Sequence, residues 1–219
     1  MPTYPRGPRL LKGAIVVVSD LGSLPQVVAF QYNPETVKRS LQPQTAGGDE
    51  GQRSQIVRYT SAPIETIELE VYIDAIDALE GNDNEAVTMG IYPRLSLLET
   101  LVYPQLQQVL QNDALLATGT MEIMPLAAPL TLFVWGPHRV LPVRLTSVSV
   151  SEELFDPNLN PIRATVSLSL RALSYADLAQ NTKGYHLFTV YQQAKEALAA
   201  QGRAESQNAP IGVNASQFQ

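Results

Sequence analysis

The chain has 219 residues, a formal net charge of −6 at pH 7 and no cysteine. A chain of this length can bury a sizeable core as one domain with an appendage. The missing thiols exclude a disulfide framework, a cysteine nucleophile and a cysteine zinc site. The acidic balance disfavours nucleic acid as a partner, and the apolar runs are too short to span a bilayer.

The N-terminal part of the sequence is typical of strands separated by turns. The pattern predicts strands over residues 14–18, 24–34, 36–41 and 64–74. Asn33 and Pro34 form a turn signal that ends the second of them. Residues 42–56 are polar and glycine-rich without a period, so we expect a long mobile loop there. The apolar phase of the fourth strand is irregular at Ile64, which predicts either a bulge or the start of the strand there.

An acidic segment runs from Tyr59 to Pro93, with eight acidic residues and no lysine or arginine. A solvated face is the ordinary interpretation, and a surface complementary to a basic partner or a neighbouring subunit is the alternative. Asp74, Asp77 and Glu80 could gather around a cation, but they lack the glycine turn and dense alternation of a calcium loop. We therefore expect no metal site in this segment.

Two regions have helical spacing. Leucines and valines over residues 95–110 recur at helical intervals, and Pro93 suits a first helical turn. Pro104 interrupts the pattern, which predicts a kinked helix or two short ones. A closing helix is expected over residues 186–201, with Gly202 as its stop. Its expected buried face consists of Leu187, Val190, Tyr191, Ala194 and Leu198.

The most regular strand pattern is the stretch 162–172, in which every second side chain is apolar. This alternation predicts one dry face and one wet face. The turn sequence DPNLNP precedes it, so 143–155 and 162–172 are expected to pair as a long antiparallel hairpin. A phase shift between Leu145 and Val148 predicts a bulge. The polar side chains of the wet face are Arg163, Thr165, Ser167, Ser169 and Arg171.

No constellation of catalytic residues occurs in the sequence. His138 and His186 have no carboxylate partner nearby, and no phosphate-cradling glycine loop or nucleophile elbow is present. Asp156, Asn158 and Asn160 alternate and could ligate a cation, although turns favour the same residue types. We therefore expect that the chain is not an enzyme and binds no cofactor or metal.

Three stretches together resemble the tube-type proteins of contractile injection systems, which are phage tail-like machines. FQYNPETVKR (30–39) resembles their Phe-x-[Phe/Tyr]-Asn-Pro-Glu opening, and LFVWG (132–136) resembles their Phe-Val-Trp-Gly strand. LFDPNLNPIRATVSLSLRA (154–172) is similar to their long hairpin. The likeness covers about residues 13–175. Its motif residues, expected to be structural, are Phe30, Tyr32, Asn33, Pro34, Trp135, Gly136, Phe155 and Pro161.

The resemblance implies a mainly β, α+β fold. In it, two packed antiparallel sheets form a small barrel with flanking helices and a long β-hairpin. This tail-tube-like domain would cover residues 1–174, and residues 175–219 would form a helix and a flexible tail. Larger relatives carry a LysM module after the tube domain. Residues 175–219 lack the Gly-Asp-[Ser/Thr]-Leu signature of that module, so we expect a compact adaptor.

The resemblance also implies a structural function in a bacterial injection particle. Six copies would form a ring at the base of the inner tube, as a tube initiator or adaptor that joins the tube to the spike hub and baseplate. The partners would be further copies, the inner-tube protein, the hub and baseplate components, without direct membrane contact. The particle would be assembled in the cytoplasm. The alternative is the repeating inner-tube protein itself, and a soluble binding module or enzyme is the third possibility.

Two sets of residues would act in such a ring. The wet face of 162–172 would line the lumen, where small hydroxyls leave the channel open and give cargo little to bind. The glycine-rich loop would contact the next ring or the hub, since a flexible loop can fold on contact. The loop candidates are Gly47, Gly48, Asp49, Glu50, Gln52 and Arg53.

Overall fold

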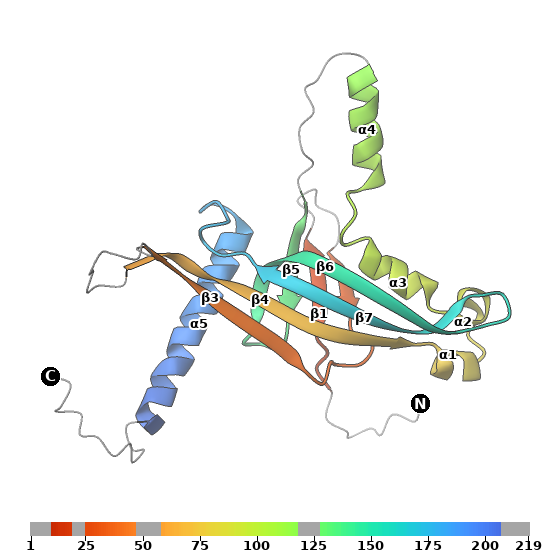
Figure 1. Cartoon of the computed structure of the whole chain (residues 1–219), viewed down its shortest axis with the longest axis horizontal. Coiled ribbons are helices and arrows are strands. Elements are labelled where there is room, and N and C mark those ends of the chain that lie inside the picture. The colour runs from red at the N-terminus through yellow and green to blue at the C-terminus, as the bar shows by residue number, and fades with distance from the viewer. Residues whose placement is uncertain (1–9, 19–24, 47–57, 118–127, 207–219) are drawn as a thin grey trace, which may run out of the picture.

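The computed structural model describes residues 10–18, 25–46, 58–117 and 128–206. Its centre is a single antiparallel sheet of seven strands in the order β2-β1-β5-β6-β7-β4-β3 (Figure 1). The strands are β1 (Ala14–Val18), β2 (Gln26–Ala29), β3 (Val37–Ala46), β4 (Arg58–Asp74), β5 (Leu130–Val134), β6 (Val140–Phe155) and β7 (Pro161–Ala172). The fold is therefore mainly β, as expected.

The expectation of two packed sheets that close into a small barrel is wrong. Each strand is hydrogen-bonded to its neighbours in a single sheet, and β2 and β3 are the edge strands of the described sheet. Side chains from both halves of the sheet nevertheless share one core, in which Ile15 and Phe133 belong to the same cluster as Ile67 and Val166. Alternation in a strand specifies which face is buried, but it does not specify what covers that face.

The described residues form five helices: α1 (Ile76–Glu80), α2 (Asn84–Met89), α3 (Tyr92–Glu99), α4 (Leu106–Ala117) and α5 (Lys183–Ser206). Pro93 lies in the first turn of α3. The helix is interrupted between Glu99 and Leu106, which confirms the prediction of two separate helices. Leu95 and Leu98 of α3 are buried in the core. By contrast, α4 projects away from the sheet (Figure 1).

At the β3–β4 hairpin, the strands are longer than the sequence predicts. Residues 42–46, expected in a loop, continue β3, and β4 begins at Arg58 rather than near Ile64. Their backbones pair, as in Thr45 opposite Tyr59, and backbone pairing needs no apolar pattern. The predicted bulge is confirmed, because the β3–β4 register shifts next to the pair Gln42 and Ile64.

The long hairpin of β6 and β7 is confirmed. The two strands pair from Val143 opposite Ala172 to Phe155 opposite Pro161. Their register shifts between Leu145 and Ser147, where the apolar phase predicted a bulge. The alternation in β7 also separates the faces as expected. The buried side chains of the alternating stretch are Ala164, Val166, Leu168, Leu170 and Ala172.

Asp156 organises the turn at the tip of this hairpin. Its Oδ1 accepts hydrogen bonds from the backbone N–H groups of Asn158 (2.7 Å) and Asn160 (2.8 Å). Its Oδ2 accepts one from Nδ2 of Asn160 (2.8 Å). These bonds, chiefly the one from the Asn160 side chain, hold the pKa of Asp156 below its ordinary value. The Asp156 carboxylate therefore stabilises the turn through these hydrogen bonds.

The base of the tip contacts the helical segment. The carbonyl of Pro161 accepts a hydrogen bond from the N–H of Ile91 (2.9 Å), and Nδ2 of Asn160 donates to the carbonyl of Thr88 (3.1 Å). Gly90 has a φ of +59°, and a Cβ there would come within 2.2 Å of the Pro161 oxygen. Only glycine fits this close approach without a shift of the backbone.

Candidate functional site

The face of the sheet opposite the core is polar, and hydroxyl side chains follow it in register. Ser147 and Ser149 of β6 lie opposite Ser169 and Ser167 of β7. On the other side of β7, β4 places a glutamate opposite each β7 serine. Two rows therefore cross three strands: Ser149–Ser167–Glu70 and Ser147–Ser169–Glu68.

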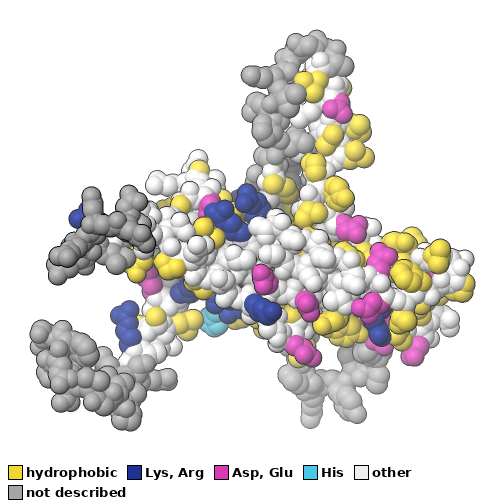
Figure 2. Space-filling model, in the orientation of Figure 1, with side chains coloured by type: hydrophobic (Ala, Val, Ile, Leu, Met, Phe, Trp, Pro, Cys, Tyr) yellow, Lys and Arg dark blue, Asp and Glu magenta, His cyan; other side chains and the backbone are white. Residues whose placement is uncertain are grey.

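A groove of about 510 Å³ lies over these rows and is the candidate site. Three glutamates line it, Glu35, Glu68 and Glu70, together with one lysine, Lys38. Lys38 lies opposite Glu68 in the β3–β4 register. The groove is thus an acidic, hydroxyl-rich surface without a histidine in its lining. Figure 2 shows this side of the molecule, where polar and charged side chains predominate over β3, β4 and β7.

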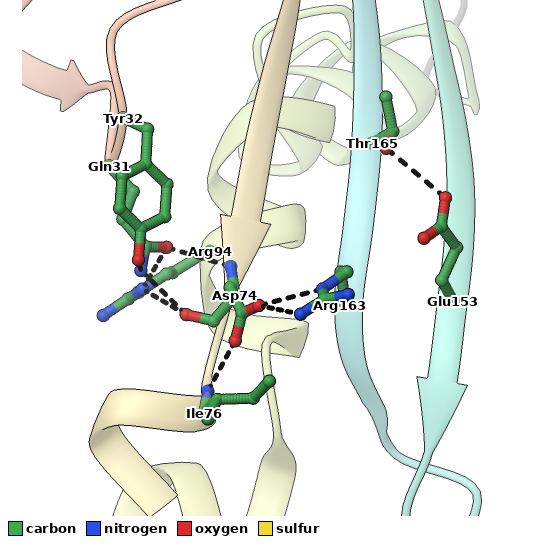
Figure 3. Close-up of polar contacts among 8 residues, drawn as sticks. All are labelled: Gln31, Tyr32, Asp74, Ile76, Arg94, Glu153, Arg163 and Thr165. Carbon is green, nitrogen blue, oxygen red and sulfur yellow. Dashed lines mark hydrogen bonds and ion pairs between the residues drawn. The ribbon is translucent and has the colours of Figure 1, made fainter.

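Ion pairs hold the two arginines at the ends of the predicted wet face. Asp74 Oδ2 lies 2.9 Å from Nε and 2.8 Å from Nη2 of Arg163 (Figure 3). Arg171 pairs through Nη2 with Oδ1 of Asp177 at 3.0 Å. Both guanidinium groups therefore lie along the sheet surface, fixed by a neighbouring carboxylate.

The hydroxyls between the arginines are less constrained. Thr165 Oγ1 donates to Glu153 Oε1 at 3.4 Å, a long bond that Figure 3 also shows. Ser169 Oγ accepts a hydrogen bond from Thr146 Oγ1 at 3.1 Å. Ser167 is exposed. The structure thus brings all five predicted wet-face residues to one side of the sheet, and whether they line a lumen stays a prediction.

A second cluster fixes the end of β4 (Figure 3). Gln31 Oε1 accepts hydrogen bonds from the N–H of Asp74 (3.1 Å) and from Nη1 of Arg94 (2.6 Å). Gln31 Nε2 donates to the carbonyl of Asp74 at 2.8 Å. One side chain after β2 thereby joins the end of β4 to α3, beside the Asp74–Arg163 ion pair.

The first family motif forms a structural corner. Phe30 is buried in the core and Pro34 is also buried, whereas Tyr32 is exposed. Asn33 Oδ1 accepts a hydrogen bond from the N–H of Gly13 (2.9 Å), and its Nδ2 donates to the carbonyl of Leu11 (2.8 Å). The asparagine therefore fixes the chain at the entry to β1.

The second motif meets the first at Gly13, a residue that the sequence analysis missed. Trp135 is half-buried and stacks on Phe133, with ring centroids 6.0 Å apart. A Cβ on Gly13 would lie 2.6 Å from the Trp135 ring and 2.9 Å from the Phe30 ring. The signal was a glycine directly before a predicted strand. Gly136 follows in a turn with a φ of +72°.

The two residues of the third motif, Phe155 and Pro161, differ in their exposure to solvent. Phe155 at the end of β6 is half exposed, whereas Pro161 at the start of β7 is buried. The predicted contact residues from Gly47 to Arg53 lie outside the described residues.

A buried ionic network attaches α5 and was also missed by the sequence analysis. Glu65, 3% exposed, accepts hydrogen bonds from Nε (2.8 Å) and Nη2 (2.6 Å) of Arg39, from Nζ of Lys195 (3.0 Å) and from the Tyr191 hydroxyl (3.2 Å). Burial by itself raises the pKa of Glu65, but Lys195 and Arg39 outweigh it and hold that pKa below its ordinary value. The sequence contained a signal for the burial of Glu65, because alternation in β4 places Glu65 on the same face as Ile67.

The predicted buried face of α5 is confirmed at Tyr191 and wrong at Val190 and Leu198, while Leu187 and Ala194 are half-buried. Val190 is 61% exposed and Leu198 is 48% exposed, whereas Phe188 and Tyr191 are buried. Lys195, one turn after Tyr191, completes the contacting side through its ion pair with Glu65. The buried stripe thus follows the ionic network rather than the most apolar side of the helix.

The described residues were compared with the requirements of a metal site and of a membrane-spanning helix. Within the described ranges, no group of three or more histidine, aspartate or glutamate side chains is arranged to hold a metal ion. None of the described helices combines the length and apolarity needed to cross a bilayer.

Comparison with known proteins identifies the family. No curated protein matches the chain. One matching solved structure is the tail of an empty GTA particle with C6 symmetry, at 10% identity and a TM-score of 0.29, covering 74% of this chain and 90% of that chain. A family model for contractile injection system tube proteins matches residues 15–181, which include nearly the whole sheet and end before α5. The chain therefore belongs to the contractile injection system tube proteins, a family with a structural role in the tail tube.

Proposed function

We propose that six copies of the chain form a ring at the base of the inner tube, which joins the tube to the spike hub and baseplate. The observation that carries the proposal is the polar face of the sheet. Its hydroxyl rows and its groove lie on the side opposite the core, where a ring can turn them inward. Small hydroxyls then leave the lumen open.

The charge of the groove adds a property to this lumen. Glu35, Glu68 and Glu70 outnumber Lys38 along the groove, and all four side chains are exposed. Repeated around a ring, this surface gives a field of negative sign that discourages acidic cargo from binding to the wall. The two arginines at the ends are neutralised by their aspartate partners.

The helix α5 favours an adaptor over a repeating tube subunit. It begins after the region that matches the family, and it extends well beyond the sheet (Figure 1). The Glu65 network and two aromatic side chains hold its first half in a defined position. An extra, firmly held projection suits a subunit that contacts a component other than its own ring. The repeating inner-tube protein remains the second candidate, favoured by the family description itself.

Particle imaging with mass determination tests the proposal. The protein is expressed alone and together with the hub and tube proteins encoded beside it. A sixfold ring, or a disc between a spike and a tube, supports the adaptor and identifies the lumen face. Unlimited stacking of this protein alone supports the repeating tube protein instead. A monomer that binds neither neighbour overturns both.

A further inference from the structure

The helix α4 presents an apolar face that no described part of its own chain buries. Leu106, Val109, Leu110 and Asp113 occupy positions i, i+3, i+4 and i+7, and so lie on one side of the helix. Leu106 is 70% exposed and Leu110 is 58% exposed. Figure 2 shows hydrophobic side chains along this projection. The face is thus apolar with one carboxylate within it.

The body of the protein carries a groove of matching character. It has a volume of about 680 Å³ and lies where β5, β6 and the start of α5 meet. The residues along it include Leu130, Leu145, Leu173 and Leu178, with two cations, Arg144 and Lys183, and no acidic residue is among the described residues that line it. Asp113 and Lys183 take part in none of the four ion pairs found among the described residues.

We propose that α4 of one copy docks by its apolar face into this groove of a neighbouring copy, with Asp113 beside Lys183. Leu101 and Val102 line the groove shortly before α4 begins, yet α4 itself leads away from the sheet (Figure 1). A second copy is the occupant that fits, because one chain carries both the apolar helix with its carboxylate and the apolar groove with its two cations. Such a head-to-tail contact can repeat around a closed ring.

The proposal rests on the proposed function only in taking a further copy as the occupant. It names a contact outside the polar face, and it gives a role to apolar side chains that a free monomer would expose to water. Because α4 is about 18 Å long by its rise per residue, it can reach beyond the outline of its own subunit.

Site-directed crosslinking tests the contact, since the full chain contains no cysteine. Two variants are made separately, Leu110→Cys and Leu178→Cys, and are mixed under oxidising conditions. We expect a disulfide-linked dimer from the mixture. The control replaces Leu110→Cys with Gln111→Cys, which lies on the other side of α4, and should lose that dimer.

Three other outcomes overturn the proposal. A monomer-sized, intramolecularly linked product from the Leu110→Cys/Leu178→Cys double variant, without linked dimer from the mixture, would place α4 in its own groove. Equal dimer from Leu110→Cys and Gln111→Cys would mean random collision. A ring seen by imaging without the crosslink would remove this contact and leave the proposed function standing.

Charge reversal gives a second test that does not alter apolar packing. Asp113→Lys and Lys183→Glu should each weaken self-association of the full chain, because each places like charges at the contact. The double variant should restore it. Association that is unchanged in both single variants, measured by sedimentation, would contradict the contact.

Discussion

Replacing Glu65 with glutamine removes the charge at the centre of the network that attaches α5 to the sheet. The substitution keeps the size of the side chain and leaves one amide oxygen to accept hydrogen bonds. It leaves two cations, Arg39 and Lys195, without their carboxylate partner. We therefore expect a loss of stability that begins with the release of α5.

The expected magnitude follows from the exposure of the partners. Removing one member of a buried ion pair costs about 3–5 kcal/mol when the remaining charge is buried. Here the side chains of Arg39 and Lys195 are 25% and 39% exposed, whereas that of Glu65 is 4% exposed. Water reaches both cations and lowers the cost, so we expect a decrease of about 2 kcal/mol in the free energy of unfolding.

Urea unfolding at pH 7 and amide hydrogen exchange in α5 measure the two effects. Glu68→Gln is the matched control, because Glu68 lies three residues along the same strand and is exposed. The Glu65→Gln variant should unfold at lower urea concentration, with faster exchange in α5. Equal unfolding free energies for the Glu65 and Glu68 variants would refute the reasoning.

The pH dependence gives an independent check. The folded-state pKa of Glu65 is lowered below its reference value of 4.5, so its contribution is fully present above pH 4.5. That contribution is lost as the pH falls from 4.5 through the folded-state value, where the carboxylate takes up a proton. The stability difference between wild type and Glu65→Gln should therefore shrink below pH 4.5. A difference that stays constant down to pH 3 would contradict the assignment.

Three further variants test other parts of the structure. Ser167→Leu with Ser169→Leu should leave unfolding unchanged but impair ring assembly or transport in imaging assays; unfolding of the double variant would mean that this face is packed. Gly90→Ala should cost about 2–4 kcal/mol in thermal or urea unfolding, because of its positive φ and the clash with the Pro161 carbonyl; a neutral effect would contradict that close approach. Asp156→Ala should speed hydrogen exchange of the two turn amides that it accepts from, and unchanged exchange would show that the turn needs no carboxylate.

Much of the local structure could be predicted from sequence because it depends on neighbouring residues. Alternation in β7 identified its buried side chains, and the phase shift after Leu145 located the β6 bulge. Pro93 and Pro104 marked the two helices α3 and α4. The resemblance to the family was also readable from the sequence, and the family match over residues 15–181 confirms it.

Contacts between distant residues could not be predicted in this way. Arg39, Glu65 and Lys195 come from three elements, and only packing of α5 against the sheet brings them together. Apolar spacing therefore predicted only part of the buried side of α5, because that side also includes Phe188 and the ion pair of Lys195 with Glu65. Gly13 likewise gained its meaning only when Phe30 and Trp135 met beside it.

The sequence by itself determined most of the strands, the dry face of β7, the turns and the family, because backbone preferences and side-chain alternation act over a few residues. The tertiary structure alone decided that the strands form one open sheet rather than two closed into a barrel. It also decided that α4 projects with its apolar side uncovered. The physical reason is that the hydrophobic effect depends on the apolar area removed from water and has no direction. A sequence pattern therefore shows which side chains must be buried, but not which element or neighbouring chain buries them.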